Sequence, residues 1–263
     1  SSSAASDVYK SQGVNILLNL FFGPAVNAAR GIAVQVQGAV TQFSTNFQTA
    51  INPQITKSYA VGDYAYMHSL IFHSSKFTFL LLATISFPVL LETEMILQLW
   101  LETVPNYTAV FVRLMLCTTI IDAMAGAFMV SAQATGAVRV YQSVVGGILL
   151  TIVPVSYIVL KMGAEPWSVF IVHLCVCILA FAVRLFILCR MIHLSLSGYF
   201  TKVLLRCMGV LIIALPLPLI LLYFLSDTFI NSIMVCLSGL LAMLFSSYVI
   251  GLVSNERKFI KAK

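Results

Sequence analysis

Long apolar segments without charge constrain the fold of this chain more than any other feature of its sequence. Residues 140–160 and 228–255 contain no Asp, Glu, Lys or Arg, and about 20 apolar residues of helix suffice to cross a bilayer. The 263-residue chain is 60% hydrophobic and only 9% charged, whereas about 25% is usual in soluble domains. A soluble globular fold is therefore excluded, and the sequence predicts a polytopic membrane protein.

Hydropathy predicts about eight membrane-crossing segments. Lipid cannot satisfy free peptide groups, so these segments must be helices or strands of a closed barrel. They are too long and too evenly apolar for barrel strands, and we expect an all-α bundle. The predicted transmembrane helices are residues 2–22, 24–56, 69–91, 107–133, 140–160, 166–189, 201–224 and 228–253.

The distribution of basic residues predicts that both ends of the chain are cytoplasmic. Cytoplasmic loops of membrane proteins are enriched in Lys and Arg, and with this topology twelve of the 15 basic residues lie on that side. Arg30 and Arg113 lie inside helices, and only Lys161 is external, with Glu92, Glu94, Glu102, Glu165 and Asp227. The twelve are Lys10, Lys57, Lys76, Arg139, Arg184, Arg190, Lys202, Arg206, Arg257, Lys258, Lys261 and Lys263.

Local signals add further expectations. Residues 95–105 mix apolar residues with Trp100 and acids, which predicts a short helix on the outer surface. Pro216 and Pro218 predict a kink in the seventh crossing. Gly136 is expected to end the fourth crossing as a C-cap. The chain begins at Ser1 with neither an initiator Met nor a signal peptide, so we expect a preceding part.

The second crossing departs from the apolar pattern of the others. From Asn27 to Asn52, twelve of 26 residues are polar, and on a helix they fall within about 100° on either side of one direction. Polar side chains at membrane depth normally face a bundle interior or a water-filled cavity. The pattern favours the wall of a translocation cavity, with interhelical hydrogen bonding as the alternative. Candidate cavity residues are Asn27, Arg30, Gln35, Gln37, Gln42, Asn46, Gln48 and Asn52.

Two charged residues on predicted helices are further candidates. The Arg30 guanidinium could hold phosphate or pyrophosphate through paired hydrogen bonds; alternatively it reaches the outer interface or pairs with an acid. Asp122 is the only acidic residue in the middle of a predicted crossing. Such a carboxylate serves either cation coupling or a proton relay, or it is a structural partner for Arg30. Arg113 is rotated about 180° from Asp122, so it cannot pair with Asp122, and we expect it to reach the outer interface.

Catalytic and metal-binding patterns are missing from the sequence. The six Cys residues lie in apolar runs, and the four His residues lack any ligand spacing. There is no phosphate-binding loop and no Gly-x-Ser-x-Gly motif. We therefore expect no enzymatic activity, no metal and no cofactor, and we attribute the formal charge of +6 to membrane topology rather than to a nucleic-acid partner.

Four stretches carry a family resemblance. They are residues 12–36 (QGVNILLNLFFGPAVNAARGIAVQV), residues 46–60 (NFQTAINPQITKSYA), residues 96–101 (ILQLWL) followed by Val104 and Pro105, and residues 133–136 (QATG). Together they resemble the C-terminal half of bacterial polysaccharide biosynthesis flippases of the O-antigen type. These flippases belong to the multidrug/oligosaccharidyl-lipid/polysaccharide exporter superfamily.

The resemblance implies a MATE-like fold, in which residues 1–190 form a six-helix C-terminal lobe and residues 191–263 add two transmembrane helices and a basic cytoplasmic tail. An N-terminal lobe would complete the central cavity. The implied function is a flippase in the bacterial inner membrane that moves an undecaprenyl-pyrophosphate-linked oligosaccharide by alternating access, for cell-surface polysaccharide or lipopolysaccharide biosynthesis. Its partners would be this glycan, membrane lipids and the other lobe. A cation-coupled multidrug and toxin extrusion antiporter is the alternative.

Overall fold

The structure is a computed structural model that describes residues 2–226, 228–253 and 256–257. Every regular element in these residues is a helix. Six helices in this part of the chain are long and apolar enough to cross a membrane, namely Tyr64–Leu91, Thr108–Ala134, Val138–Lys161, Ser168–Ile192, Leu196–Phe224 and Phe229–Gly251. The protein is therefore an all-α, multi-pass membrane protein.

Two further helices precede these six. Helix α1 (Ser2–Phe22) has 21 residues and helix α2 (Pro24–Ala60) has 37, which at about 1.5 Å per residue is enough to span a bilayer. Neither is among the six apolar candidates, because polar side chains lower their hydropathy. The count of eight crossings thus stays a prediction for these two helices.

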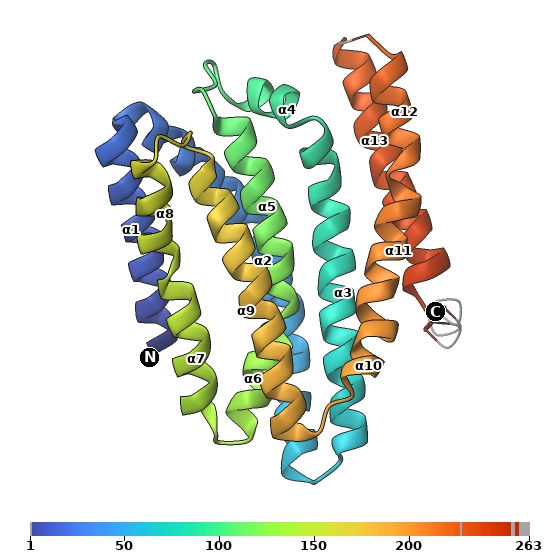
Figure 1. Cartoon of the computed structure of the whole chain (residues 1–263). Coiled ribbons are helices and arrows are strands. Elements are labelled where there is room, and N and C mark those ends of the chain that lie inside the picture. The colour runs from blue at the N-terminus through green and yellow to red at the C-terminus, as the bar shows by residue number, and fades with distance from the viewer. Residues whose placement is uncertain (1, 227, 254–255, 258–263) are drawn as a thin grey trace.

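The helices run up and down between two ends of the bundle, and their connections alternate between these ends (Figure 1). Short breaks divide three of the long helices into segments. After α2 the elements are α3 (Tyr64–Leu91), α4 (Thr93–Trp100), α5 (Thr108–Met124), α6 (Gly126–Ala134), α7 (Val138–Leu150), α8 (Ile152–Lys161), α9 (Ser168–Ile192), α10 (Leu196–Tyr199), the π-helix η1 (Phe200–Leu204), α11 (Leu205–Ala214), α12 (Pro216–Phe224), α13 (Phe229–Ser246) and the π-helix η2 (Ser247–Gly251).

Several local predictions are confirmed. Gly136 has φ +74°, a conformation that glycine adopts without strain, and it directly follows Thr135, the residue that caps the end of α6. The seventh crossing is interrupted at Leu215, immediately before Pro216. Helix α4 covers most of the predicted surface helix and lies across one end of the bundle (Figure 1).

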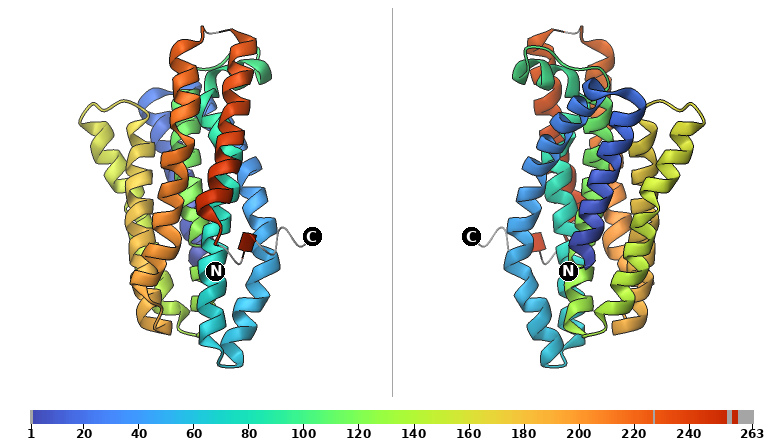
Figure 2. Two further views of the ribbon diagram at one scale, coloured as in Figure 1. Left: turned by 90° about the vertical axis from the view of Figure 1, so that its right-hand side faces the viewer. Right: turned by 90° about the vertical axis from the view of Figure 1, so that its left-hand side faces the viewer.

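Helix α5 lies at the centre of the bundle. It packs against α2, α3 and α9, and Phe111 and Leu116 on α5 are fully buried. Helix α13 packs against α3, away from α1 and α7 (Figure 1). Helix α2 runs along one edge of the bundle in both side views (Figure 2), so only part of its circumference is covered by other helices.

Some of the basic residues predicted to be cytoplasmic lie near one end of the bundle and others lie deeper inside helices, whereas the orientation in the membrane stays a prediction. Lys57, Arg139 and Arg190 lie within four residues of a turn at the lower end in Figure 1. Lys10, Lys76 and Arg184 instead lie inside α1, α3 and α9, since interior acids and cavities accommodate their charge. Lys258, Lys261, Lys263 and Asp227 lie outside the described residues.

Candidate functional site

The polar face of α2 divides into an outward half and an inward half. Gln35, Gln42 and Asn46 are exposed at the surface of the bundle, and the Gln42 amide donates a hydrogen bond of 3.2 Å to Asn46 Oδ1. On a helical wheel these three side chains lie about 60–100° clockwise of Asn27, whereas Gln37 and Gln48 lie about 60–80° on the other side. The outward half therefore forms an exposed strip of amides, which we call the α2 amide strip: Gln35, Gln42 and Asn46.

The inward half makes the interhelical hydrogen bonds that were the alternative interpretation. Gln37 Nε2 donates to Thr119 Oγ1 over 2.9 Å, and Gln48 Nε2 donates to the Ala123 carbonyl over 2.8 Å. Both acceptors belong to α5. Gln37 and Gln48 also line a cavity of about 240 Å³, so their role in a translocation cavity stays a prediction, although each amide donates to α5.

Gln48 supports a break in the long helix formed by α5 and α6. The helix is interrupted at Ala125, so nearby carbonyl groups need other donors. Gln48 serves the Ala123 carbonyl, and the Ser75 hydroxyl donates to the Met124 carbonyl over 2.7 Å. Gly126 leaves room for this arrangement, because a Cβ atom there would lie 2.6 Å from Cδ of Gln48.

Asn27 and Asn52 lie between the two halves. Each is partly buried, and within the described part of the chain each has a buried Oδ1 atom without a hydrogen-bond partner. A buried acceptor without a partner is costly unless water or a ligand reaches it. Both residues can therefore accept a hydrogen bond from water or a ligand beside the α2 amide strip.

Asp122 forms an ion pair with Arg184. Arg184 Nη1 on α9 lies 2.7 Å from Asp122 Oδ1 on α5. The alternative in which Asp122 is the partner of Arg30 is wrong, because Arg30 Nη2 instead donates to the Ser11 carbonyl over 2.9 Å and to its hydroxyl over 3.0 Å. The Arg30 contacts join α2 to α1.

Two cavities meet at Asp122. One, of about 240 Å³, lies between α1, α2, α5 and α9 and is lined by Lys10, Gln37, Thr119 and His173. The other, of about 260 Å³, is lined by Tyr141, Gln142 and Arg184, and Asp122 lines both. The Asp122 side chain is 45% exposed, because it borders these cavities rather than close-packed neighbours.

The two cavities contain unused hydrogen-bonding capacity. His173 Nε2, Tyr141 Oη and Arg184 Nε are buried without a hydrogen-bond partner among the described residues. In a low-dielectric interior such atoms bind water or a polar ligand. The arrangement can hold polar groups at membrane depth, with one carboxylate and one guanidinium already neutralising each other.

Arg184, Lys10, His173 and Tyr141 were not among the sequence candidates. Arg184 and Lys10 were attributed to cytoplasmic helix ends, although Arg184 lies eight residues before the last residue of α9. An ionisable residue inside an apolar helix is a functional candidate by default, and this criterion would have identified Arg184. For Tyr141 and His173 the sequence offers no comparable signal.

Arg113 also has partners at its end of α5. Its Nε donates to Thr93 Oγ1 over 3.0 Å, and Nη2 lies 3.7 Å from Glu94 Oε1. Among the described residues, no three His, Cys, Asp or Glu side chains are grouped so that they could hold a metal ion. Comparisons with protein-family models, with curated proteins and with solved structures found no match for this chain.

Proposed function

We propose that this chain forms one wall of a hydrophilic passage in a flippase for lipid-linked oligosaccharides. The observation that carries the proposal is the α2 amide strip. Gln42 lies at the middle of a 37-residue helix and is exposed. Its amide bonds only to Asn46 Oδ1 among the described residues, and polar atoms left unpaired against acyl chains cost several kcal/mol, on the order of 2 to 7 for a whole amide. An aqueous passage, closed on its far side by an N-terminal lobe, removes this cost.

Carbohydrate is the cargo that best fits these side chains. Amides and hydroxyl groups offer both donors and acceptors, as a polyhydroxyl ligand requires. Arg30 is the cation on the same helix that would hold the pyrophosphate. In this proposal the chain crosses the bacterial inner membrane eight times, with α1 and α2 as the first two crossings. Both ends are cytoplasmic, which agrees with Lys57, Arg139 and Arg190 near one end of the bundle.

A cation-coupled antiporter is the second candidate. Asp122 supports it, since its side chain is 45% exposed toward two cavities and a carboxylate there could take up a cation or a proton. This mechanism requires Asp122 to exchange Arg184 for the coupling ion. The oligosaccharide proposal has no such requirement, and the amide strip favours it.

Water access to the α2 amide strip is the most direct test. In a cysteine-free version of the natural full-length protein, a membrane-impermeant maleimide should label Gln42→Cys and Asn46→Cys in intact membranes. Leu241→Cys is the matched control, because Leu241 is also exposed but lies on α13, where we expect lipid. Protection of Gln42→Cys and Asn46→Cys to the same degree as Leu241→Cys would rule out a passage at this face.

Complementation distinguishes the two cargos. The full-length protein is expressed in a strain without its O-antigen flippase and, separately, in a drug-sensitive strain without efflux pumps. We expect restored surface polysaccharide and no drug resistance. Gln42→Leu should abolish the restoration, whereas Gln98→Leu, the same substitution at an exposed position of α4, should not. Drug resistance without polysaccharide export would favour the antiporter.

A further inference from the structure

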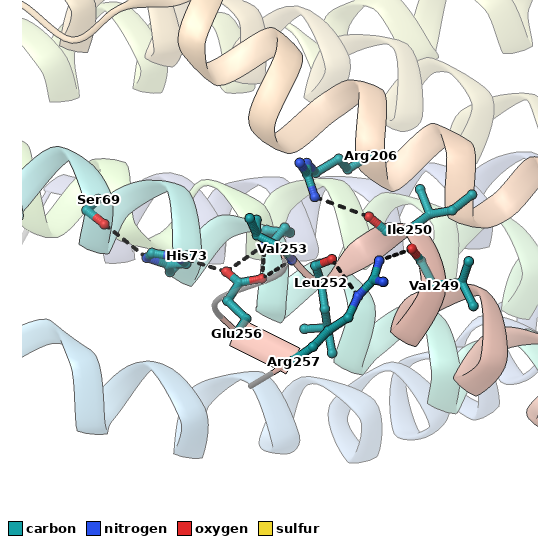
Figure 3. A network of polar contacts seen from close by, with 10 residues as sticks. Ser69, His73, Arg206, Val249, Ile250, Leu252, Val253, Glu256 and Arg257 are labelled. Carbon is teal, nitrogen blue, oxygen red and sulfur yellow. Dashed lines mark hydrogen bonds and ion pairs between the residues drawn. The ribbon is translucent and has the colours of Figure 1, made fainter. Parts of the chain in front are cut away.

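A third cavity, of about 550 Å³, is lined by α3 and by the C-terminal part of the described chain, and none of its lining residues belongs to α2. It is bounded by α3, by η1 and α11, and by the C-terminal residues that follow η2 (Figure 3). Most of its ionisable lining is basic or imidazole. The residues that matter here are His68, His73, Lys76, Lys202, Arg206 and Glu256.

The Glu256 carboxylate occupies a cradle of donors in this cavity. Lys76 Nζ donates to both carboxylate oxygens, over 2.8 and 2.7 Å. His73 Nε2 lies 2.9 Å from Oε1, and the Val253 N–H donates to Oε2 over 2.7 Å (Figure 3). Burial raises the pKa of Glu256, but the hydrogen bonds from Lys76 and Val253 outweigh it and keep the pKa below its ordinary value.

The positive charge of the cavity exceeds what Glu256 neutralises. Lys76 is 3% exposed and is paired with Glu256. Lys202 and Arg206 line the same cavity but form no ion pair with any described residue. Lys202 lies 5.9 Å from the centroid of the Phe72 ring, and Arg206 donates to the Ile250 carbonyl over 3.4 Å. The Glu256 carboxylate is already paired with Lys76, so the charges of Lys202 and Arg206 in this cavity are not neutralised by it.

We propose that this cavity binds the phosphate group of an anionic membrane lipid, with Lys202 and Arg206 as its principal contacts and Glu256 as a competing internal anion. Lys and Arg are the usual partners of phosphate oxygens. The site is separate from the α2 amide strip and does not depend on which cargo that strip serves.

A lipid is a better source of phosphate here than free phosphate, because the cavity adjoins a lipid-facing surface. Helix α11, which carries Arg206, exposes Leu205, Met208 and Ile212. Apolar residues of this kind accommodate acyl chains while the basic residues reach the headgroup, as is usual at the membrane interface. Lys202 is itself exposed, so a headgroup can approach without prior opening of the bundle.

Native mass spectrometry of the full-length protein tests the proposal. The purified protein is titrated with phosphatidylglycerol, with zwitterionic phosphatidylcholine as the comparison lipid. We expect Lys202→Ala/Arg206→Ala to weaken phosphatidylglycerol retention about tenfold, as loss of charge-assisted hydrogen bonds predicts. Lys57→Ala/Arg139→Ala is the matched control, because it removes two exposed charges outside the cavity. Glu256→Gln should tighten retention, because it removes the competing negative charge.

The outcomes separate the possible explanations. Equal losses of phosphatidylglycerol retention in the cavity variant and in the control would mean that surface charge in general causes the effect, and the proposed site would be wrong. Unchanged retention in Lys202→Ala/Arg206→Ala would also overturn it. If inorganic phosphate displaces phosphatidylglycerol at equal concentration, the anion site stands and free phosphate becomes its source. Lys202 is exposed and Arg206 partly exposed, and thermal unfolding of each variant confirms that the fold is intact.

Discussion

Arg184 on α9 and Asp122 on α5 form an ion pair of 2.7 Å whose two members differ in exposure. The Arg184 side chain is 14% exposed, whereas the Asp122 side chain is 45% exposed because it borders two cavities. Removal of one partner leaves the other charge uncompensated, and the penalty grows with burial. The pair therefore predicts an asymmetry between its two single substitutions.

Asp122→Asn should destabilise the protein more than Arg184→Gln. The first leaves a mostly buried guanidinium unpaired, at a cost of about 2 kcal/mol, and the second leaves an accessible carboxylate, at a cost of about 1 kcal/mol after allowance for solvent. Unfolding in mixed detergent and dodecyl sulfate micelles measures both. Arg190→Gln is the control, since Arg190 is exposed on the same helix. Equal losses for the two substitutions would contradict this account of the pair.

Arg30→Ala should abolish export of the lipid-linked glycan while the protein still inserts in the membrane. The proposed reason is the loss of a cation for the pyrophosphate, but Arg30 also ties α2 to α1 through Ser11. Ser11→Ala removes the hydroxyl acceptor and keeps the guanidinium, so it should leave export near normal. Surface polysaccharide is the measurement. An equal defect in Ser11→Ala would assign Arg30 a structural role only.

Gly126→Ala should cost about 1 kcal/mol of stability. The new Cβ atom would displace the Gln48 amide, and the Ala123 carbonyl would lose its donor. In a Gln48→Ala background the same substitution should cost nothing, because the obstructing side chain is absent. Gly147→Ala is the control, since nothing lies within 4 Å of its Cβ position. A Gly126→Ala cost that persists without Gln48 would mean that another contact is responsible.

The ionised Glu256 carboxylate should stabilise the fold at pH values above 4.5, the ordinary pKa of this group. This stabilisation should be lost as the pH falls through the lower pKa that the group has in the folded state. His68, His73, Lys76, Lys202 and Arg206 line this cavity, so the measurement uses a His68→Gln/His73→Gln background, in which no imidazole lines it. The difference in thermal midpoint between the protein that keeps Glu256 and the Glu256→Gln variant should be constant from about pH 5 to 8 and shrink below about pH 4.5. A difference that instead disappears on raising the pH would contradict the assignment.

The apolar helices could be predicted from the sequence because their determinants are local. Each of the six apolar spans corresponds to a predicted crossing. The helix ends near Gly136 and before Pro216 were also predictable, because glycine and proline change the allowed backbone conformation at their own positions. The polar arc of α2 was also evident, since it depends only on helical periodicity.

The division of that arc could not be predicted from the sequence. All its residues share one helix and one chemistry, yet Gln48 binds α5 whereas Gln42 is exposed. Which side chain meets a neighbour depends on how far α2 is rotated relative to α5, and packing over the whole interface sets this rotation. For the same reason, Asp122 pairs with Arg184 and not with Arg30.

By itself, the sequence determined that this protein consists of membrane helices and which of them carries polar groups, because hydrophobicity and periodicity are properties of single segments. Only the tertiary structure decided which charges neutralise each other, which amides are committed to packing and where basic residues surround a cavity. These outcomes depend on contacts between residues such as Lys76 and Glu256, which are 180 positions apart, and such contacts follow from the packing of the complete bundle.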